Sequence, residues 1–221
     1  MNPDLWTKVD DFFANGLLAD DGVLTDTVAA NRNAGLPAID VSPLQGKLLY
    51  LLAKMQAAKT ILEIGTLGGY STIWLARALP PDGRLVTLEM EPKHALVAQQ
   101  NIERAQLTPQ VNIVVGPALE SLPKIKAEKG GPFDLIFIDA DKPNTWSYFQ
   151  FALELARSGT LIIADNVVRK GEIIDATSQD PSVQGMRLFT ERLAQEARVE
   201  ATAIQTVGAK GYDGFILARV K

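Results

Sequence analysis

Residues 60–71 of the chain are Thr-Ile-Leu-Glu-Ile-Gly-Thr-Leu-Gly-Gly-Tyr-Ser. The run 60–64 is short and largely apolar, and glycines follow it at once, which is typical of a buried strand that turns into a helix. Further runs of this kind follow along the chain, separated by helical patterns. We expect strands at 85–89, 111–115, 135–138 and 160–164, and helices at 71–79, 92–105 and 146–155.

This alternation predicts parallel strands joined by right-handed crossovers. Because the runs are almost continuously apolar, helices should cover both faces of the sheet. After a last helix near 183–195, runs at 199–206 and 215–220 flank the glycine-containing stretch 208–214 and predict an antiparallel pair. The predicted fold class is therefore α/β: a Rossmann-like, doubly wound sheet of seven strands, mostly parallel, with an antiparallel C-terminal hairpin.

The length of 221 residues suits a single α/β domain spanning 1–221, and we find no linker, repeat or low-complexity tract. About 58 residues precede the first strand and form an expected helical extension. Leu5, Val9 and Phe13 recur at helical spacing and predict an amphipathic helix. Ser42 as a cap and Pro43 in the first turn predict a second helix over 44–54.

Composition narrows the classes of function. The net charge of −4 provides no basic field, so we expect no nucleic-acid partner. The absence of cysteine excludes disulfides, a thiolate metal site and a cysteine nucleophile, and it suits the cytoplasm. We see no signal-peptide pattern, and the apolar stretch 48–53 is far shorter than the ~20 residues that cross a bilayer, so no membrane partner is expected.

The residues after the first two strands indicate a nucleoside-bearing cofactor. Ligands of doubly wound sheets bind at the carboxyl ends of the strands, where Gly65 permits close approach and Glu89 can accept hydrogen bonds from a ribose diol. The spacing from Gly65 is G-x-x-G-G rather than the dinucleotide G-x-G-x-x-G. Glu63 would repel a phosphate but suits a cationic sulfonium, which favours S-adenosylmethionine over NAD. The alternative is a tight glycine-rich turn without a ligand.

Acidic and amide side chains follow the next two strands. Asp139 and Asp141 come after 135–138, and Asp165 and Asn166 come after 160–164. Such residues can simply cap the following helices, but this cluster is denser than capping requires. Asp139, Asp165 and Asn166 offer only oxygen ligands, which select a divalent cation of the magnesium, manganese or calcium type.

These stretches resemble the cation-dependent caffeoyl-CoA/catechol O-methyltransferase family. The similarity runs from about Ala38 to the C-terminus. It is carried by Leu62-Glu63-Ile64-Gly65-Thr66, Gly69-Tyr70-Ser71, Gly116-Pro117-Ala118, Phe137-Ile138-Asp139-Ala140-Asp141-Lys142 and Asp165-Asn166.

The resemblance implies an S-adenosylmethionine- and metal-dependent O-methyltransferase that acts on a catechol-like phenolic small molecule, Mg²⁺ being the first choice of metal, and it suggests a homodimer. It assigns Asp139, Asp165 and Asn166 to the metal and Lys142 to the catalytic base. It assigns to the cofactor Val41, Glu63, Gly65, Ser71, Glu89, Ala118, Asp139 and Asp141. Plant members usually have Asp at position 89, and at position 170 they have a substrate-contacting Asn where this chain has Lys.

Two other functions remain open from the sequence: a nicotinamide-dependent oxidoreductase, and a non-catalytic cofactor-binding module. We expect His94 on a solvated helix face, a solvated loop around the charged residues 124–129, and a mobile substrate loop at 169–182. Trp146, Tyr148 and Phe149 could belong to the core or line a substrate pocket, and at least two of them should be core.

Overall fold

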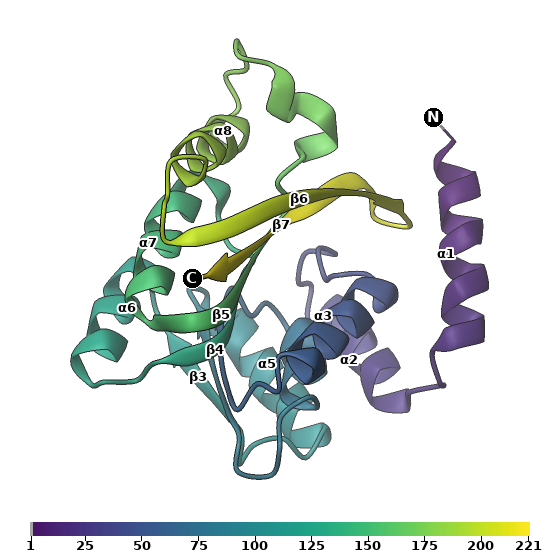
Figure 1. Ribbon diagram of the computed structural model, residues 1–221. Helices are drawn as coiled ribbons and strands as arrows, with labels where there is room; N and C mark the ends of the chain where they lie inside the picture. The colour runs from purple at the N-terminus through teal and green to yellow at the C-terminus, as the bar shows by residue number, and fades with distance from the viewer. Residues whose placement is uncertain (1) are drawn as a thin grey trace.

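The computed structural model describes residues 2–221 and contains one sheet in the order β3-β2-β1-β4-β5-β7-β6 (Figure 1). The first five strands of that order are parallel, and β7 is antiparallel to both β5 and β6. The predicted seven-stranded α/β fold is therefore confirmed. The strands are β1 Thr60–Ile64, β2 Arg84–Glu89, β3 Val111–Val115, β4 Phe133–Ile138, β5 Ala156–Asp165, β6 Val199–Gly208 and β7 Gly211–Val220.

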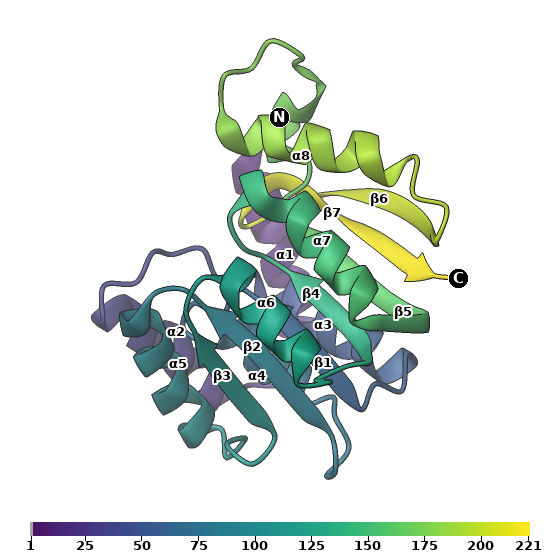
Figure 2. The ribbon, with the colours of Figure 1, turned by 90° about the vertical axis from the view of Figure 1, so that its left-hand side faces the viewer.

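Helices cover both faces of the sheet (Figure 2). Buried residues of α2, α3, α4 and α5 pack on one face, and those of α6, α7 and α8 pack on the other. The helices are α1 Pro3–Leu17, α2 Gly22–Asn33, α3 Pro43–Met55, α4 Tyr70–Ala76, α5 Pro92–Arg104, α6 Ala118–Ala127, α7 Thr145–Glu154 and α8 Pro181–Leu193, with short 3-10 turns η1 Lys142–Asn144 and η2 Arg169–Ile174.

The core follows the two-residue period of the strands. In β1, Ile61 faces the α3–α4 side, whereas Leu62 and Ile64 face the α6–α7 side. In β4, Phe137 and Ile138 divide between the two faces in the same way. Burial on both sides explains why these strands are continuously apolar in sequence. The chain reverses its direction of winding at β1, which lies between β2 and β4, and ligands of such sheets bind at this point.

Some local expectations were wrong. The charged residues expected in a loop at 124–129 partly belong to α6, which continues to Ala127 although Pro123 lies inside it. The C-terminal strands meet at the short turn 209–210, so 211–214 is strand rather than connecting loop. The segment 169–182, expected as a mobile substrate loop, contains η2 and the first residues of α8, and its mobility stays a prediction.

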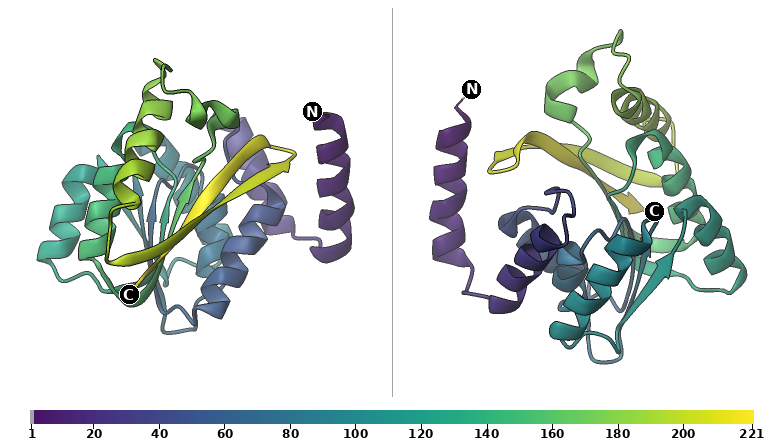
Figure 3. Two further views of the ribbon diagram at one scale, coloured as in Figure 1. Left: turned by 45° about the horizontal axis from the view of Figure 1, so that its top comes forward. Right: turned by 180° about the vertical axis from the view of Figure 1, so that it is seen from behind.

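Helix α1 lies at the edge of the molecule, near the turn between β6 and β7 (Figure 3). The Asp10 carboxylate of α1 accepts a hydrogen bond of 2.8 Å from the backbone N–H of Ala209 in that turn. None of the residues of α1 is buried, and apolar Phe12 and Leu17 are exposed by 74% and 70%. In residues 2–221, the helices are all too short or too polar to pass through a bilayer.

Candidate active site

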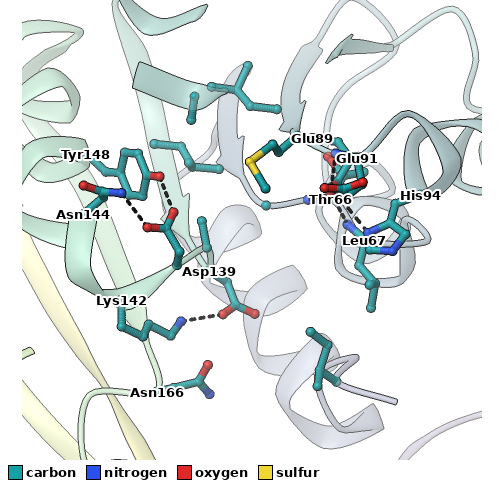
Figure 4. A pocket seen from close by; sticks show the side chains of 18 of the residues that line it. Thr66, Leu67, Glu89, Glu91, His94, Asp139, Lys142, Asn144, Tyr148 and Asn166 are labelled. Atoms are coloured by element: carbon teal, nitrogen blue, oxygen red, sulfur yellow. Dashed lines mark hydrogen bonds and ion pairs between the residues drawn. The ribbon is translucent and has the colours of Figure 1, made fainter. Parts of the chain in front are cut away.

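A cavity of about 790 Å³ lies at the carboxyl ends of β1, β2, β4 and β5 (Figure 4). Most of the residues predicted to contact cofactor or metal line it. They are Val41, Gly65, Ser71, Glu89, Ala118, Asp139, Asp141, Lys142 and Asn166. Two predicted residues, Glu63 and Asp165, are not part of the lining and lie buried beneath it.

Glu63 supports the cavity floor from below. Its carboxylate is fully buried and accepts hydrogen bonds from the hydroxyls of Ser71 at 2.6 Å, Thr72 at 2.5 Å and Thr87 at 2.7 Å. Burial raises the pKa of Glu63 from 4.5 to about 7. Because Ser71 does line the cavity, Glu63 acts on the site by orienting this hydroxyl.

The raised pKa of Glu63 predicts a pH-dependent stability. The folded state holds the proton more tightly than the unfolded state, so this stabilisation is full below pH 4.5 and is lost as the pH rises through 7. Relative to Glu63→Gln, the free energy of unfolding of the wild type should fall by roughly 3 kcal/mol between about pH 4 and pH 8. Urea unfolding of both proteins across this range measures it. A difference that does not vary with pH would contradict the burial of an ionisable carboxyl here.

Two glycines before α4 are needed for contacts within the protein. Gly65 has a φ of +101°, and a Cβ there would lie 2.0 Å from the backbone carbonyl of Asp139. A Cβ on Gly68 would lie 1.8 Å from the side-chain oxygen of Asn31. The buried Asn101 amide donates to that same oxygen at 3.0 Å and to the Gly68 carbonyl at 2.8 Å, which fixes the loop against α2 and α5.

Glu89, at the end of β2, organises the turn after β1. One carboxylate oxygen accepts hydrogen bonds from the backbone N–H groups of Thr66 at 3.2 Å and Leu67 at 2.7 Å. The other accepts from the backbone N–H of Glu91 at 3.0 Å and lies 3.4 Å from Nδ1 of His94. The expectation of a solvated His94 was wrong, because its ring is partly buried and lines the cavity, as Figure 4 shows.

Asp141 is held by two side chains that reach it from η1 and α7. The Asn144 amide donates to one of its oxygens at 2.6 Å, and the Tyr148 hydroxyl donates to the other (Figure 4). Burial and the adjacent Asp141 raise the pKa of Tyr148 above that of an ordinary tyrosine. Tyr148 and Phe149 are buried, as predicted for two of the three aromatic residues, but Tyr148 also lines the cavity.

The residues predicted to bind a metal lie around Lys142. Its buried ammonium is 2.8 Å from a carboxylate oxygen of Asp139 (Figure 4). The Asp165 carboxylate accepts hydrogen bonds from the side-chain amide of Gln45 at 2.7 Å and from the backbone N–H of Asn166 at 2.8 Å. Burial raises the pKa of Asp165 to about 7, and the negative charge of Asp139 adds to this effect. The carboxylates of Asp139 and Asp165 therefore lie close enough for their negative charges to repel each other.

This arrangement fits a hard divalent cation. No group of three or more His, Cys, Asp or Glu side chains in residues 2–221 is placed to hold a metal, but the predicted set has two carboxylates and one amide. Each carboxylate oxygen of Asp165 accepts one hydrogen bond and retains a second lone pair. The donors are all oxygens, and a cation would offset the repulsion between Asp139 and Asp165.

Sequence reasoning missed Gln45 and the pair Asn31–Asn101. Gln45 is the polar residue at the third position of α3, after the Ser42 cap, and it reaches Asp165 across 120 positions of sequence. Asn101 is completely buried on α5. The sequence signal for Gln45 and for Asn101 is a polar residue on an otherwise apolar helix face. This signal does not identify the residue with which the side chain forms its hydrogen bond.

Known O-methyltransferases resemble this chain over most or all of its length. The O-methyltransferase family model matches residues 18–221. A catechol O-methyltransferase of Niastella koreensis is 54% identical over the whole of both chains, and one of Mycobacterium tuberculosis is 52% identical over 96% of this chain and 95% of its own length.

Solved structures extend the comparison to the cofactor. The O-methyltransferase of Bacillus cereus in complex with SAH has a TM-score of 0.98 and 58% identity, covering all of both chains. TomG of Streptomyces achromogenes, involved in tomaymycin synthesis and solved with SAM, has a TM-score of 0.96 and 48% identity, covering 100% of this chain and 99% of its own. This chain therefore belongs to the O-methyltransferase family and is an S-adenosylmethionine-dependent enzyme.

Proposed function

We propose that this enzyme transfers the methyl group of S-adenosylmethionine to one hydroxyl of a catechol-like, vicinal-diol phenol, and that it requires a divalent cation. The observation that carries this proposal is the placement of Asp139, Asn166 and Lys142 on the wall of the same cavity as Glu89 and Ser71. Two relatives more than 50% identical to this chain bear the name catechol O-methyltransferase, which supports the choice of acceptor.

The cofactor is proposed to lie across the ends of β1, β2 and β4. Glu89 would accept hydrogen bonds from the ribose diol, and Asp141, held by Tyr148 and Asn144, would accept from the base. Ser71 would contact the amino acid part, supported by Glu63. Val41, Gly65, Ala118 and Asp139 complete the proposed contacts, and all four line the cavity.

We propose that Asp139, Asp165 and Asn166 hold the cation, with Mg²⁺ as the first candidate and Mn²⁺ or Ca²⁺ as alternatives. When bound, the cation would anchor two adjacent oxygens and favour the ionised form of a hydroxyl. In its neutral amine form, Lys142 would accept the hydroxyl proton at Nζ, which lies 2.8 Å from Asp139. The new bond joins the methyl carbon to the phenolic oxygen as the bond to the sulfonium sulfur breaks.

The decisive experiment measures methyl transfer from labelled S-adenosylmethionine to a panel of catechols and caffeoyl esters, with and without chelator. A protein that binds S-adenosylmethionine but methylates none of the panel would overturn the proposed acceptor class.

Replacing Glu89 should weaken S-adenosylmethionine binding. Glu89→Ala removes the acceptor proposed for the ribose and also frees the N–H groups of Thr66 and Leu67. A charged hydrogen bond is worth about 1.5–3 kcal/mol, so the dissociation constant should rise by about tenfold or more. Calorimetry measures it, and Glu103→Ala on the exposed face of α5 is the control. Equal affinities in both variants would remove Glu89 from the site.

We also propose that the chain forms a homodimer. In support, α1 exposes Leu5, Phe12 and Leu17 while none of its residues is buried in its own chain. An apolar helix face of this kind is commonly covered by another surface. Sedimentation velocity measures the oligomeric state, and a single species of 24.0 kDa at micromolar concentration would reject the dimer.

A further inference from the structure

The cavity wall includes an arginine, Arg169, that has no role in the proposed methyl transfer. The sequence comparison pointed to position 170 as a substrate contact, but Lys170 is exposed and does not line the cavity. Its neighbour Arg169 does, together with Asn166 on one side and Ser182 at the start of α8. The substrate-facing position of this turn is therefore occupied by an arginine.

The turn that contains Arg169 has an unusual backbone conformation, which Asp213 stabilises. Arg169, Lys170 and Gly171 have φ values of +54°, +58° and +93°, a left-handed run that non-glycine residues adopt only when other contacts compensate for it. Asp213 of β7 supplies those contacts. Its carboxylate accepts from the backbone N–H of Val168 at 2.9 Å and of Arg169 at 3.1 Å.

The guanidinium of Arg169 has a donor without a partner among residues 2–221. Its Nε is buried and has no hydrogen-bond partner, and Arg169 forms no ion pair within residues 2–221. Among residues 2–221, the lining contains one other lysine or arginine, which is Lys142. Its Nζ is already paired with a carboxylate oxygen of Asp139 at 2.8 Å. A buried donor without an acceptor is costly, so an arginine in this state is poised for an acceptor that arrives with a ligand.

The unpaired guanidinium, and not the net charge of the cavity, indicates what that ligand carries. The lining includes the carboxylates of Asp40, Glu89, Glu91, Asp139 and Asp141, which would repel an anionic molecule unless a free cation received it. The planar guanidinium matches a carboxylate with two parallel hydrogen bonds, and Nε is one of the donors used in that arrangement.

We propose that Arg169 is a specificity-determining residue that binds the carboxylate of an acidic acceptor, so that the preferred substrates are catechols bearing a carboxylate-containing side group. This inference rests on the proposed function, since it assigns the diol end of the acceptor to the side of the cavity with Asp139 and Asn166. The carboxylate of S-adenosylmethionine is the other possible source of the same chemistry, and the experiment separates the two.

The test compares catechol with 3,4-dihydroxybenzoate, which differ by one carboxylate. Their dissociation constants are measured calorimetrically in the presence of Mg²⁺ and SAH for the wild type, Arg169→Gln, Arg169→Lys and Lys170→Gln. Lys170→Gln is the matched control, because it removes the same charge one residue away from an exposed side chain. The dissociation constant of S-adenosylmethionine is measured in each variant as well.

The wild type should bind 3,4-dihydroxybenzoate more tightly than catechol. In Arg169→Gln this preference should fall by about tenfold or more, in Arg169→Lys it should be partly kept, and in Lys170→Gln it should persist. The inference is overturned if Arg169→Gln keeps the preference, if Lys170→Gln loses it equally, or if the loss falls on S-adenosylmethionine instead. Turnover of catechol by the wild type tests the proposed function separately, because the ratio of dissociation constants does not depend on methyl transfer.

Discussion

Exhaustive chelation is expected to lower methyl transfer to a catechol by at least about a hundredfold, and added Mg²⁺ is expected to restore it. Asp139 and Asp165 bring two negative charges together beside a single lysine, and burial with the charge of Asp139 raises the pKa of Asp165 to about 7. A bound cation removes this repulsion and contributes several kcal/mol to reactions at an ionising oxygen. Full turnover after chelation would reject the metal-dependent mechanism.

Asp165→Ala should cause a comparable loss of activity while leaving the affinity for S-adenosylmethionine within about threefold of the wild type. Asp165 lies at the end of β5 and is not part of the cavity lining, whereas the proposed cofactor contacts lie at the ends of β1, β2 and β4. Asp82→Ala, in an exposed turn, is the control for the loss of one carboxylate. Loss of cofactor binding in a folded Asp165→Ala protein would show that the positions proposed for the metal and the cofactor are wrong.

The centre of the sheet could be predicted from sequence because β1 and β4 are buried on both faces and bounded by turn residues. In β4 every residue is buried, and all but Asp134 are apolar. Helices α2 and α6 could not be predicted in the same way. Helix α2 contains β-branched residues and asparagines and has little net hydrophobicity, and α6 contains Pro123 and several charges. Packing against α5 and α7 decides these helices, and local propensity does not reveal such packing.

The site could be predicted where residues end neighbouring strands. Parallel strands place their carboxyl ends on one edge, so Glu89, Asp139 and Asn166 meet at one cavity although long segments separate them in sequence. Whether a side chain lines the cavity or lies buried outside the lining could not be predicted. Glu63 and Asp165 proved to be buried and to accept hydrogen bonds from hydroxyl or amide donors of distant elements, and His94 proved to line the cavity. These details depend on side-chain contacts between elements distant in sequence.

A catechol is expected to be methylated at least about a hundredfold faster than the matching monophenol. If Asp139, Asp165 and Asn166 hold a cation, an acceptor with two adjacent hydroxyls can use one oxygen as an anchor and the other for attack. A monophenol offers a single oxygen, so it loses both the orientation and the acidification of the reacting hydroxyl. The difference should therefore be larger in kcat than in KM. Equal rates for both acceptors would show that the diol is not required.

Lys142→Met should lower turnover of the catechol most at low pH and least at high pH. An isolated phenol has a pKa of about 10, so near pH 7 little of it ionises without a base, whereas at higher pH a base becomes dispensable. Lys142 is placed for this role, because it lines the cavity and its Nζ lies 2.8 Å from a carboxylate oxygen of Asp139, and only its neutral amine form would act as the base. Lys124→Met on the exposed side of α6 is the matched control. Rate–pH profiles of the three proteins decide the matter: a Lys142→Met profile parallel to the wild type at every pH would leave Lys142 as a fixed charge beside Asp139 and not as the base.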